Sequence, residues 1–279
     1  MARRTEPTPL SLLPALQTQL WFASCDETFQ QALVERSRLW HIRAGDYLFT
    51  QGDDMEGLCC VVAGALKLGS SDQHDGSLLL TLYVEPYTWF GEISAIDGLP
   101  RSQDAVADVD STVMVIPKQA LDEWLEAHPL NWRDLARLAC AKLRMVLTAL
   151  EDAATLTIEQ QLCRRLLLSA TNFGQSTQPS VKRRVRLPQD YLARMLGVSR
   201  QTVNKVLRTL EREGVLALHY AEIEIVDLFG LVQRSGNLDR AEKFLNMPAT
   251  VTSAMKSAPA GAPVAPEGPA QAGSTSASG

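Results

Sequence analysis

The chain has 279 residues, a net charge of −5 and an apolar fraction of 46%, which is the length of about two domains and the composition of an ordinary globular protein. No apolar run approaches the roughly 18 residues needed to span a bilayer, and the N-terminus lacks the continuous apolar core of a secretory signal, so we expect a cytoplasmic protein without a membrane partner. The five cysteines lack paired spacing and include no Cys-x-x-Cys, which argues against a disulfide framework and against a metal site.

Charge is divided unevenly along the chain. Residues 157–246 hold 14 Lys and Arg against 9 Asp and Glu, a net charge of +5. The remainder holds 13 basic and 23 acidic residues, a net charge of −10. This division favours a nucleic acid as the partner of the basic part, with chance scatter on solvated faces as the alternative.

The first part of the chain predicts short helices followed by strands. Residues 11–40 have the apolar spacing of short helices. From about 41 to 117, short β-prone runs such as YLFTQGDD and STVMVIP are separated by glycine and aspartate, which predicts an antiparallel barrel or roll. The glycines expected at turns that need a positive φ are Gly52, Gly64, Gly76 and Gly98.

Two helices are expected next. One begins near Lys118 and stops before Pro129, and a longer one covers about 130 to 156. The longer helix has apolar residues at alternating spacings of three and four, the pattern of a coiled-coil seam. This pattern indicates either a helix packed on its own domain or a two-stranded coiled coil that makes a homodimer. The seam positions are Ala136, Ala139, Leu143, Val146, Leu150 and Ala153.

The basic part contains a helix-turn-helix pattern. Pro188 suits the first turn of a helix, and Gly197 permits a tight turn four residues after the small Ala193. Ser199 can cap the second helix, and Val203 completes the Ala-x3-Gly-x5-Val frame. One apolar face is expected from Leu192, Leu196, Val198, Val203 and Val206.

The second helix of this motif carries the expected DNA contacts. Such helices place their N-terminal residues against base edges in the major groove. Arg200, Gln201 and Lys205 are the predicted base readers, because Arg suits guanine and Gln suits adenine. Thr202 and Arg208 are predicted to meet phosphate. Gly214 ends this helix and is followed by two β runs around residues 220–222, which predicts a winged domain. The full predicted set is Ser199, Arg200, Gln201, Thr202, Asn204, Lys205 and Arg208.

A β-roll, a long helix and a winged domain containing GVSRQTVNKVL together resemble the Crp–Fnr family of bacterial transcription regulators, over about residues 20–235. A second motif, Phe90-Gly91-Glu92-Ile93 followed by Leu99-Pro100-Arg101-Ser102, resembles the phosphate-binding cassette of cyclic-nucleotide domains. The resemblance implies an α+β fold with an antiparallel β-roll over 1–128, a dimerisation helix over 129–156 and a winged helix-turn-helix over 157–246. The Ala-, Pro- and Gly-rich tail over 247–279 is expected to be disordered.

The resemblance also implies an effector site. Arg101 would hold a phosphate with a charge-assisted pair, and Ser102 would donate to the same oxygens. Glu92 would accept the ribose 2′-hydroxyl, and Gly91 would allow close backbone approach. The predicted ligand residues are Gly91, Glu92, Ile93, Arg101, Ser102 and Thr148. The implied effector is cyclic AMP, cyclic GMP or cyclic di-GMP.

Several positions depart from the family pattern. Gln103 stands where the cassette usually has alanine. Val146 and Leu147 stand where the cyclic-AMP-binding member has Thr and Ser, with Thr148 one position along. Gln201 stands where that member has Glu, which predicts a shifted half-site because Glu accepts from cytosine. The iron–sulfur sensors of the family need a cysteine cluster near the N-terminus, and only Cys25 lies there.

The sequence therefore predicts a homodimeric, ligand-responsive transcription regulator that binds an imperfect palindrome in double-stranded DNA. RNA polymerase is a further partner that the resemblance implies. The alternative is a constitutive DNA-binding regulator whose roll is an unliganded scaffold. An enzyme is not expected, because the sequence shows no nucleophile–base constellation and no phosphate-binding glycine loop.

Overall fold

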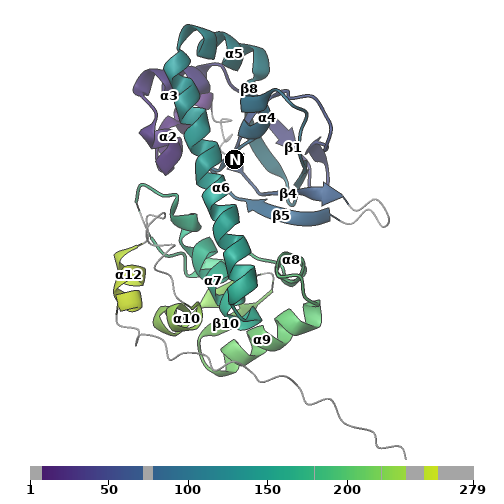
Figure 1. The fold of residues 1–279 in the computed structure, drawn as a ribbon, viewed down its shortest axis with the longest axis vertical. Coiled ribbons are helices and arrows are strands. Elements are labelled where there is room, and N and C mark those ends of the chain that lie inside the picture. The colour runs from purple at the N-terminus through teal and green to yellow at the C-terminus, as the bar shows by residue number, and fades with distance from the viewer. Residues whose placement is uncertain (1–7, 72–77, 179, 221, 237–247, 257–279) are drawn as a thin grey trace, which may run out of the picture.

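A computed structural model describes residues 8–71, 78–178, 180–220, 222–236 and 248–256. One long helix, α6 (Trp132–Thr155), runs along the greater part of the molecule (Figure 1). The sheets and the helices that precede α6 lie beside its first half, and the helices that follow α6 surround its second half. Helix α6 therefore contacts both parts of the chain that the sequence separates by charge.

Four short helical segments open the described chain, as the sequence predicts. Their apolar residues pack with α6 and with one face of a sheet in a core that includes Trp21, Phe22, Phe29 and Trp89. Strand β1 begins at Arg38, so the β region starts three residues earlier than the pattern predicts. The elements are η1 (Pro9–Leu12), α1 (Leu13–Leu16), α2 (Leu20–Ser24), α3 (Glu27–Glu35) and β1 (Arg38–Ile42).

Two four-stranded antiparallel sheets form the roll, with strand orders β1-β8-β3-β6 and β2-β7-β4-β5. Strand β3 has six consecutive buried residues, because one of its faces packs on the second sheet and the other packs on the helices. Strand β7 has no counterpart among the β runs picked out from the sequence. The strands are β2 (Tyr47–Phe49), β3 (Gly57–Ala63), β4 (Leu66–Ser71), β5 (Leu78–Val84), β6 (Trp89–Phe90), β7 (Asp104–Ala107) and β8 (Ser111–Pro117).

Turn glycines behave as expected where they are described. Gly52, Gly64 and Gly98 have φ values of +91°, +83° and +71°, while Gly76 lies outside the described residues. Helix α5 (Lys118–Ala127) stops before Pro129, and the 3-10 turn η2 (Pro129–Asn131) leads into α6.

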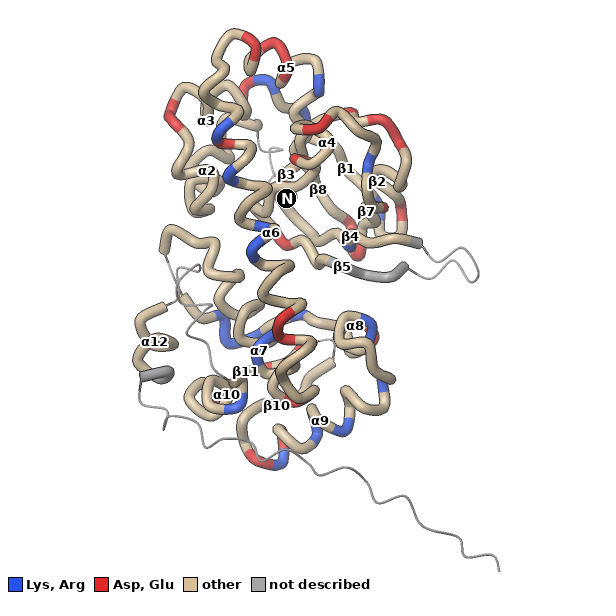
Figure 2. The backbone as a smooth tube through the Cα atoms, viewed as in Figure 1, with Lys and Arg blue, Asp and Glu red and all other residues tan. Residues whose placement is uncertain are grey.

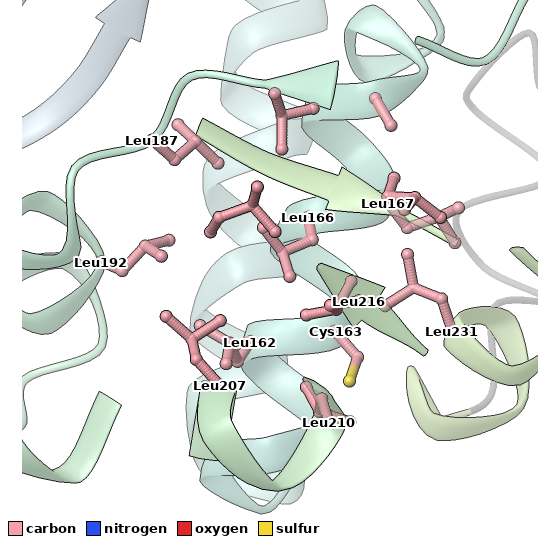
Figure 3. Close-up of a cluster of buried hydrophobic side chains, with 14 of the residues drawn as sticks. Leu162, Cys163, Leu166, Leu167, Leu187, Leu192, Leu207, Leu210, Leu216 and Leu231 are labelled. Atoms are coloured by element: carbon pink, nitrogen blue, oxygen red, sulfur yellow. The ribbon is translucent and has the colours of Figure 1, made fainter. Parts of the chain in front are cut away.

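The C-terminal half has its own apolar core, built on α7 (Ile158–Ala170) and shown in Figure 3. Leu162, Leu166 and Leu167 of α7 are fully buried there. A capping box at Thr157 and Gln160 begins α7 directly after α6 ends. The other elements are η3 (Asn172–Gly174), β9 (Arg184–Val185), α8 (Gln189–Met195), α9 (Arg200–Arg212), β10 (Leu216–His219), β11 (Glu222–Ile225) and α10 (Leu228–Arg234).

The expectation of a disordered tail from residue 247 does not hold for its first residues. Residues Ala249–Lys256 form helix α12, which contacts α10, and Val251 is fully buried in the C-terminal core. The prediction failed because it used the average composition of the whole tail, which is rich in Pro, Ala and Gly. A helix of eight residues with one buried valine changes that average little. The rest of the tail, from 257 onward, lies outside the described residues.

The two halves also touch away from α6. The rings of Tyr83 on β5 and Tyr191 on α8 lie 5.7 Å apart, and Lys182 pairs with Glu85 at 3.2 Å. Among the described residues, no helix is long and apolar enough to cross a membrane.

Candidate functional site

The predicted helix-turn-helix is formed by α8 and α9. Gly197 has a φ of +64°, and the Val198 N–H donates to the Ala193 carbonyl at 3.0 Å, which closes the turn between the helices. The Ser199 hydroxyl accepts from the Thr202 N–H at 3.1 Å, which is the expected N-cap. Val203 and Leu192 are fully buried, so the predicted apolar face anchors α9 to the core.

The opposite face of α9 is exposed to solvent. Figure 2 shows basic residues along this helix. The Arg200 guanidinium lies 3.5 Å from the Asp190 carboxylate, and Arg208 pairs with Glu211 at 2.7 Å. Both pairs are largely exposed and are therefore weak, so they leave the arginines available to an incoming phosphate or base. The exposed predicted contacts are Ser199, Arg200, Gln201, Asn204, Lys205 and Arg208, and Thr202 is half-buried at the cap.

A wing follows the helix, as predicted. Strands β10 and β11 pair antiparallel, and Tyr220 at the connection is fully exposed. Sequence reasoning missed the third strand, β9, which pairs with β11 at the edge of the wing. Arg184 and Arg186, on and just after β9, form ion pairs with the β11 residues Glu224 and Glu222.

The cassette residues surround the start of helix α4 (Glu92–Asp97). Gly91 has a φ of +87°, and a Cβ there would lie 2.6 Å from an Arg101 nitrogen. Arg101 is 4% exposed and donates to the carbonyls of Gly57 at 2.6 Å and Gly91 at 3.3 Å. Its guanidinium stacks over the Phe49 ring at 4.2 Å, and its Nε has no hydrogen-bond partner within the described part of the chain.

Glu92 contacts a residue that sequence reasoning missed. Its side chain is 2% exposed, and its Oε2 accepts from the Lys142 ammonium of α6 at 2.6 Å. Lys142 is itself only a quarter exposed. A buried carboxylate is costly unless it is paired, so this contact is the charge compensation of Glu92. The ion pair joins the cassette directly to the long helix.

The remaining predicted ligand residues lie differently. Ile93 and Ser102 are exposed next to the buried pair of Glu92 and Arg101. The Thr148 hydroxyl donates to the Arg144 carbonyl at 3.0 Å, and its side chain lines a cavity together with residues of α7. The structure therefore groups Gly91, Glu92 and Arg101, and it does not place Thr148 with them.

Four of the five cysteines are buried, and Cys140 on α6 is exposed. Cys25, Cys59, Cys60 and Cys163 are buried, and burial raises the pKa of each thiol above its ordinary value, to about 12 for Cys59 and Cys163. Neutral buried thiols are poor nucleophiles and poor metal ligands. Within the described ranges, no group of three or more His, Cys, Asp or Glu side chains could hold a metal ion.

Two family models match the chain. The model of the cyclic nucleotide-binding domain matches residues 39–128, and that of the Crp-like helix-turn-helix domain matches residues 160–234. A β-roll with such a cassette, joined by a long helix to a winged helix-turn-helix, defines a DNA-binding transcription regulator with a nucleotide-binding-type sensor domain.

Known relatives agree with this class. The transcriptional regulator SdrP from Thermus thermophilus is 31% identical over 172 residues, which cover 61% of this chain and 80% of the relative. A CRP-like cAMP-activated global transcriptional regulator from Mycobacterium tuberculosis is 27% identical over 191 residues, covering 68% and 85%. The crystal structure of a CRP/FNR-family regulator from T. thermophilus has a TM-score of 0.55 and 25% identity, covering 71% and 98%. The chain belongs to the Crp–Fnr family of transcription regulators, which are not enzymes.

Proposed function

We propose that the protein is a homodimer whose β-roll binds one cyclic mononucleotide per protomer and thereby changes its affinity for DNA. The observation that carries this proposal is the buried pair of opposite charges in the cassette, Arg101 and Glu92, which are 4% and 2% exposed. A buried cation and a buried carboxylate within one cassette match the phosphate and the ribose hydroxyl of one nucleotide.

The charges of the roll favour a mononucleotide over cyclic di-GMP. A second phosphate would call for a second basic side chain near the cassette. Within the described part of residues 1–128, Lys67 pairs with Asp108 at 3.0 Å and Lys118 pairs with Asp122, and Lys142 of α6 pairs with Glu92. The M. tuberculosis relative is named as cAMP-activated, and we propose cyclic AMP as the first effector to test.

Ligand binding at this site would change existing contacts. The Arg101 guanidinium now donates to two backbone carbonyls, and a phosphate oxygen would compete for those N–H groups. It would also accept from the Nε, which has no partner among the described residues. A ribose hydroxyl that donates to Glu92 would compete with Lys142. Lys142 belongs to α6, so a ribose that replaced Lys142 at Glu92 would break a contact between the cassette and that helix. The ligand-free and ligand-bound proteins would then differ in this contact.

An apolar stripe on α6 supports the dimer. Leu143, Val146, Leu147 and Leu150 are each more than half exposed, at helical spacings of three and four. Exposed apolar residues in this arrangement form the seam of a two-stranded coiled coil. We propose that a second copy of α6 packs on this stripe. The corresponding domains are the roll over 1–128, the dimerisation helix over 129–156 and the DNA-binding domain over 157–246.

Two-fold symmetry has consequences for the DNA. The two α9 helices would enter successive major grooves about 34 Å apart, so the site is an imperfect palindrome. Arg200, Gln201 and Lys205 would read bases, and Thr202 and Arg208 would meet phosphate. Binding to chromosomal DNA places the proposed site of action in the cytoplasm, with RNA polymerase as a further partner.

Calorimetric titration of the purified protein with cyclic AMP, cyclic GMP and cyclic di-GMP tests the effector. We expect one mononucleotide to bind each protomer, with binding lost in Arg101→Ala and retained in Arg43→Ala, which removes an exposed arginine of the same roll. Absence of heat from all three, in a folded protein that still binds DNA, would contradict the proposal and favour a roll that serves only as a scaffold.

A further inference from the structure

A cavity of about 320 Å³ lies between α6 and the DNA-binding half, away from the cassette. Its walls come from α6, α7, the η3 segment and the end of α8. This α6–α7 cavity includes Met145, Thr148, Arg165, Leu168, Phe173 and Met195 among its lining residues. Its size falls within the range of small-molecule sites.

The lining combines an excess of positively charged side chains with a group of apolar side chains, called the apolar floor below. Arg144, Arg164 and Arg165 line the cavity, and Asp152 is the lining acid. Asp152 is paired with Arg164, and desolvation by burial raises the pKa of that carboxyl above its ordinary value. The apolar contribution comes from two methionines, two leucines and Phe173. Such a lining fits an organic molecule with one anionic group and an apolar body.

Arg165 is the residue best placed to hold the anionic group. Its Nη2 donates to the Tyr191 hydroxyl at 2.7 Å, and its guanidinium lies 5.0 Å from the centre of the Phe173 ring. Its Nε is buried and has no hydrogen-bond partner within the described ranges. A buried donor of a charged group without a partner is unfavourable, and an anion held by the Arg165 guanidinium would offset part of that cost.

The segment that carries Phe173 is strained. Asn172 and Phe173 both have positive φ, +51° and +53°, a region that residues other than glycine adopt rarely. Strain of this kind persists only where the surroundings impose it, and it is concentrated at binding and switch sites. Here the strained segment carries Phe173, whose ring lines the cavity beside the Arg165 guanidinium.

A second copy of α6 would not fill this cavity. Most of the lining residues on α6 follow a helical repeat at Ala141, Arg144, Met145, Thr148, Ala149 and Asp152, and Ala153, a predicted seam position, lines the cavity at its edge. The exposed stripe of Leu143, Val146, Leu147 and Leu150 is displaced from them by two positions. Two positions correspond to about 200° around a helix, so the stripe and the cavity occupy opposite faces.

We propose that the α6–α7 cavity is a second ligand site, for a small organic monoanion with an apolar body, held by Arg165 and by the apolar floor. The ligand would contact α6 on one side and α7 and α8 on the other, so its occupancy would bias how the DNA-binding half sits on the long helix. This site shares no residue with the cassette, and Thr148, which the resemblance assigned to the effector, lines this cavity instead.

Decanoate is a suitable probe, with decanol as its uncharged counterpart, and binding can be followed by calorimetry on the full-length protein. We expect one decanoate per protomer, and an affinity at least about tenfold higher than that of decanol. Arg165→Gln should remove this preference, whereas Arg133→Gln, an exposed arginine on α6, should leave it unchanged. Ala141→Phe should abolish binding of both molecules by filling the cavity.

Circular dichroism of each variant establishes that it is folded, so that Ala141→Phe tests the site even where Arg165→Gln is unstable. Binding of decanoate should persist in Arg101→Ala, because the cassette is separate. The proposal is overturned by equal affinities of decanoate and decanol, by unchanged binding in both cavity variants, by loss of binding in Arg101→Ala, or by no binding of decanoate up to about 1 mM, a very weak affinity.

Discussion

The ion pair between Glu92 and Lys142 gives the sharpest test of how the cassette is linked to α6. Lys142→Ala leaves the Glu92 carboxylate, which is 2% exposed, without its compensating charge. Removing one partner of a buried pair costs about 3–5 kcal/mol, and the partial exposure of Lys142 argues for the lower end, about 3 kcal/mol. For a protein of this length, that free energy lowers Tm by about 6–12 °C.

Differential scanning calorimetry of four proteins measures this effect: the wild type, Lys142→Ala, Glu92→Gln and the double variant. The double variant should recover most of the lost stability, because neither charge remains buried alone. Lys118→Ala is the matched control, since Lys118 and Asp122 form an exposed pair on α5 worth less than about 1 kcal/mol. Equal losses of stability in Lys142→Ala and Lys118→Ala would refute the reasoning.

Three further predictions follow from single residues. Gly91→Ala should weaken effector binding and lower the free energy of unfolding more than Gly98→Ala does. Both glycines have positive φ, but only Gly91 lies against Arg101. Equal losses in the two variants, measured by calorimetry, would contradict this. Gln201→Glu should shift one position of the selected DNA half-site from adenine toward cytosine by about 1–3 kcal/mol, and identical selected sequences would count against the assignment. A hydrogen bond from Thr28, with others from Phe29 N–H and Asn131, lowers the pKa of Asp26. The Asp26 carboxylate therefore stabilises the fold above its unfolded pKa, and this stabilisation is lost as pH falls through its folded pKa. The free energy of unfolding should therefore fall less steeply for Asp26→Asn than for the wild type as pH is lowered below about 4. Parallel plots of this free energy against pH would exclude this role of Asp26.

Local sterics explain why the DNA-reading element could be predicted from the sequence. Ala193, Gly197 and Val203 are each constrained within one short motif, and the cap at Ser199 follows from its own neighbours. The roll was predictable as a class, because its strands are short and its turns carry glycine. The strands β7 and β9 were missed, since four- and two-residue strands give too little periodicity to recognise.

The interior of the candidate site was less accessible to sequence reasoning. The cassette motif identified Gly91, Glu92 and Arg101, but nothing in the local pattern indicates that Lys142 contacts Glu92 across fifty positions of sequence. The stacking of Arg101 on Phe49 also depends on how the two sheets close. The α6–α7 cavity is likewise a product of tertiary packing, because its lining comes from four separate segments.

The central claim is that occupancy of the cassette controls binding to DNA. Fluorescence anisotropy with a labelled palindromic site, selected for binding by this protein, measures that affinity with and without saturating cyclic mononucleotide at one fixed salt concentration. We expect the nucleotide to change the affinity of the wild type at least about fivefold and to have no effect on Arg101→Ala, which should still bind the same site. Equal affinity of the wild type with and without a bound nucleotide would contradict the account.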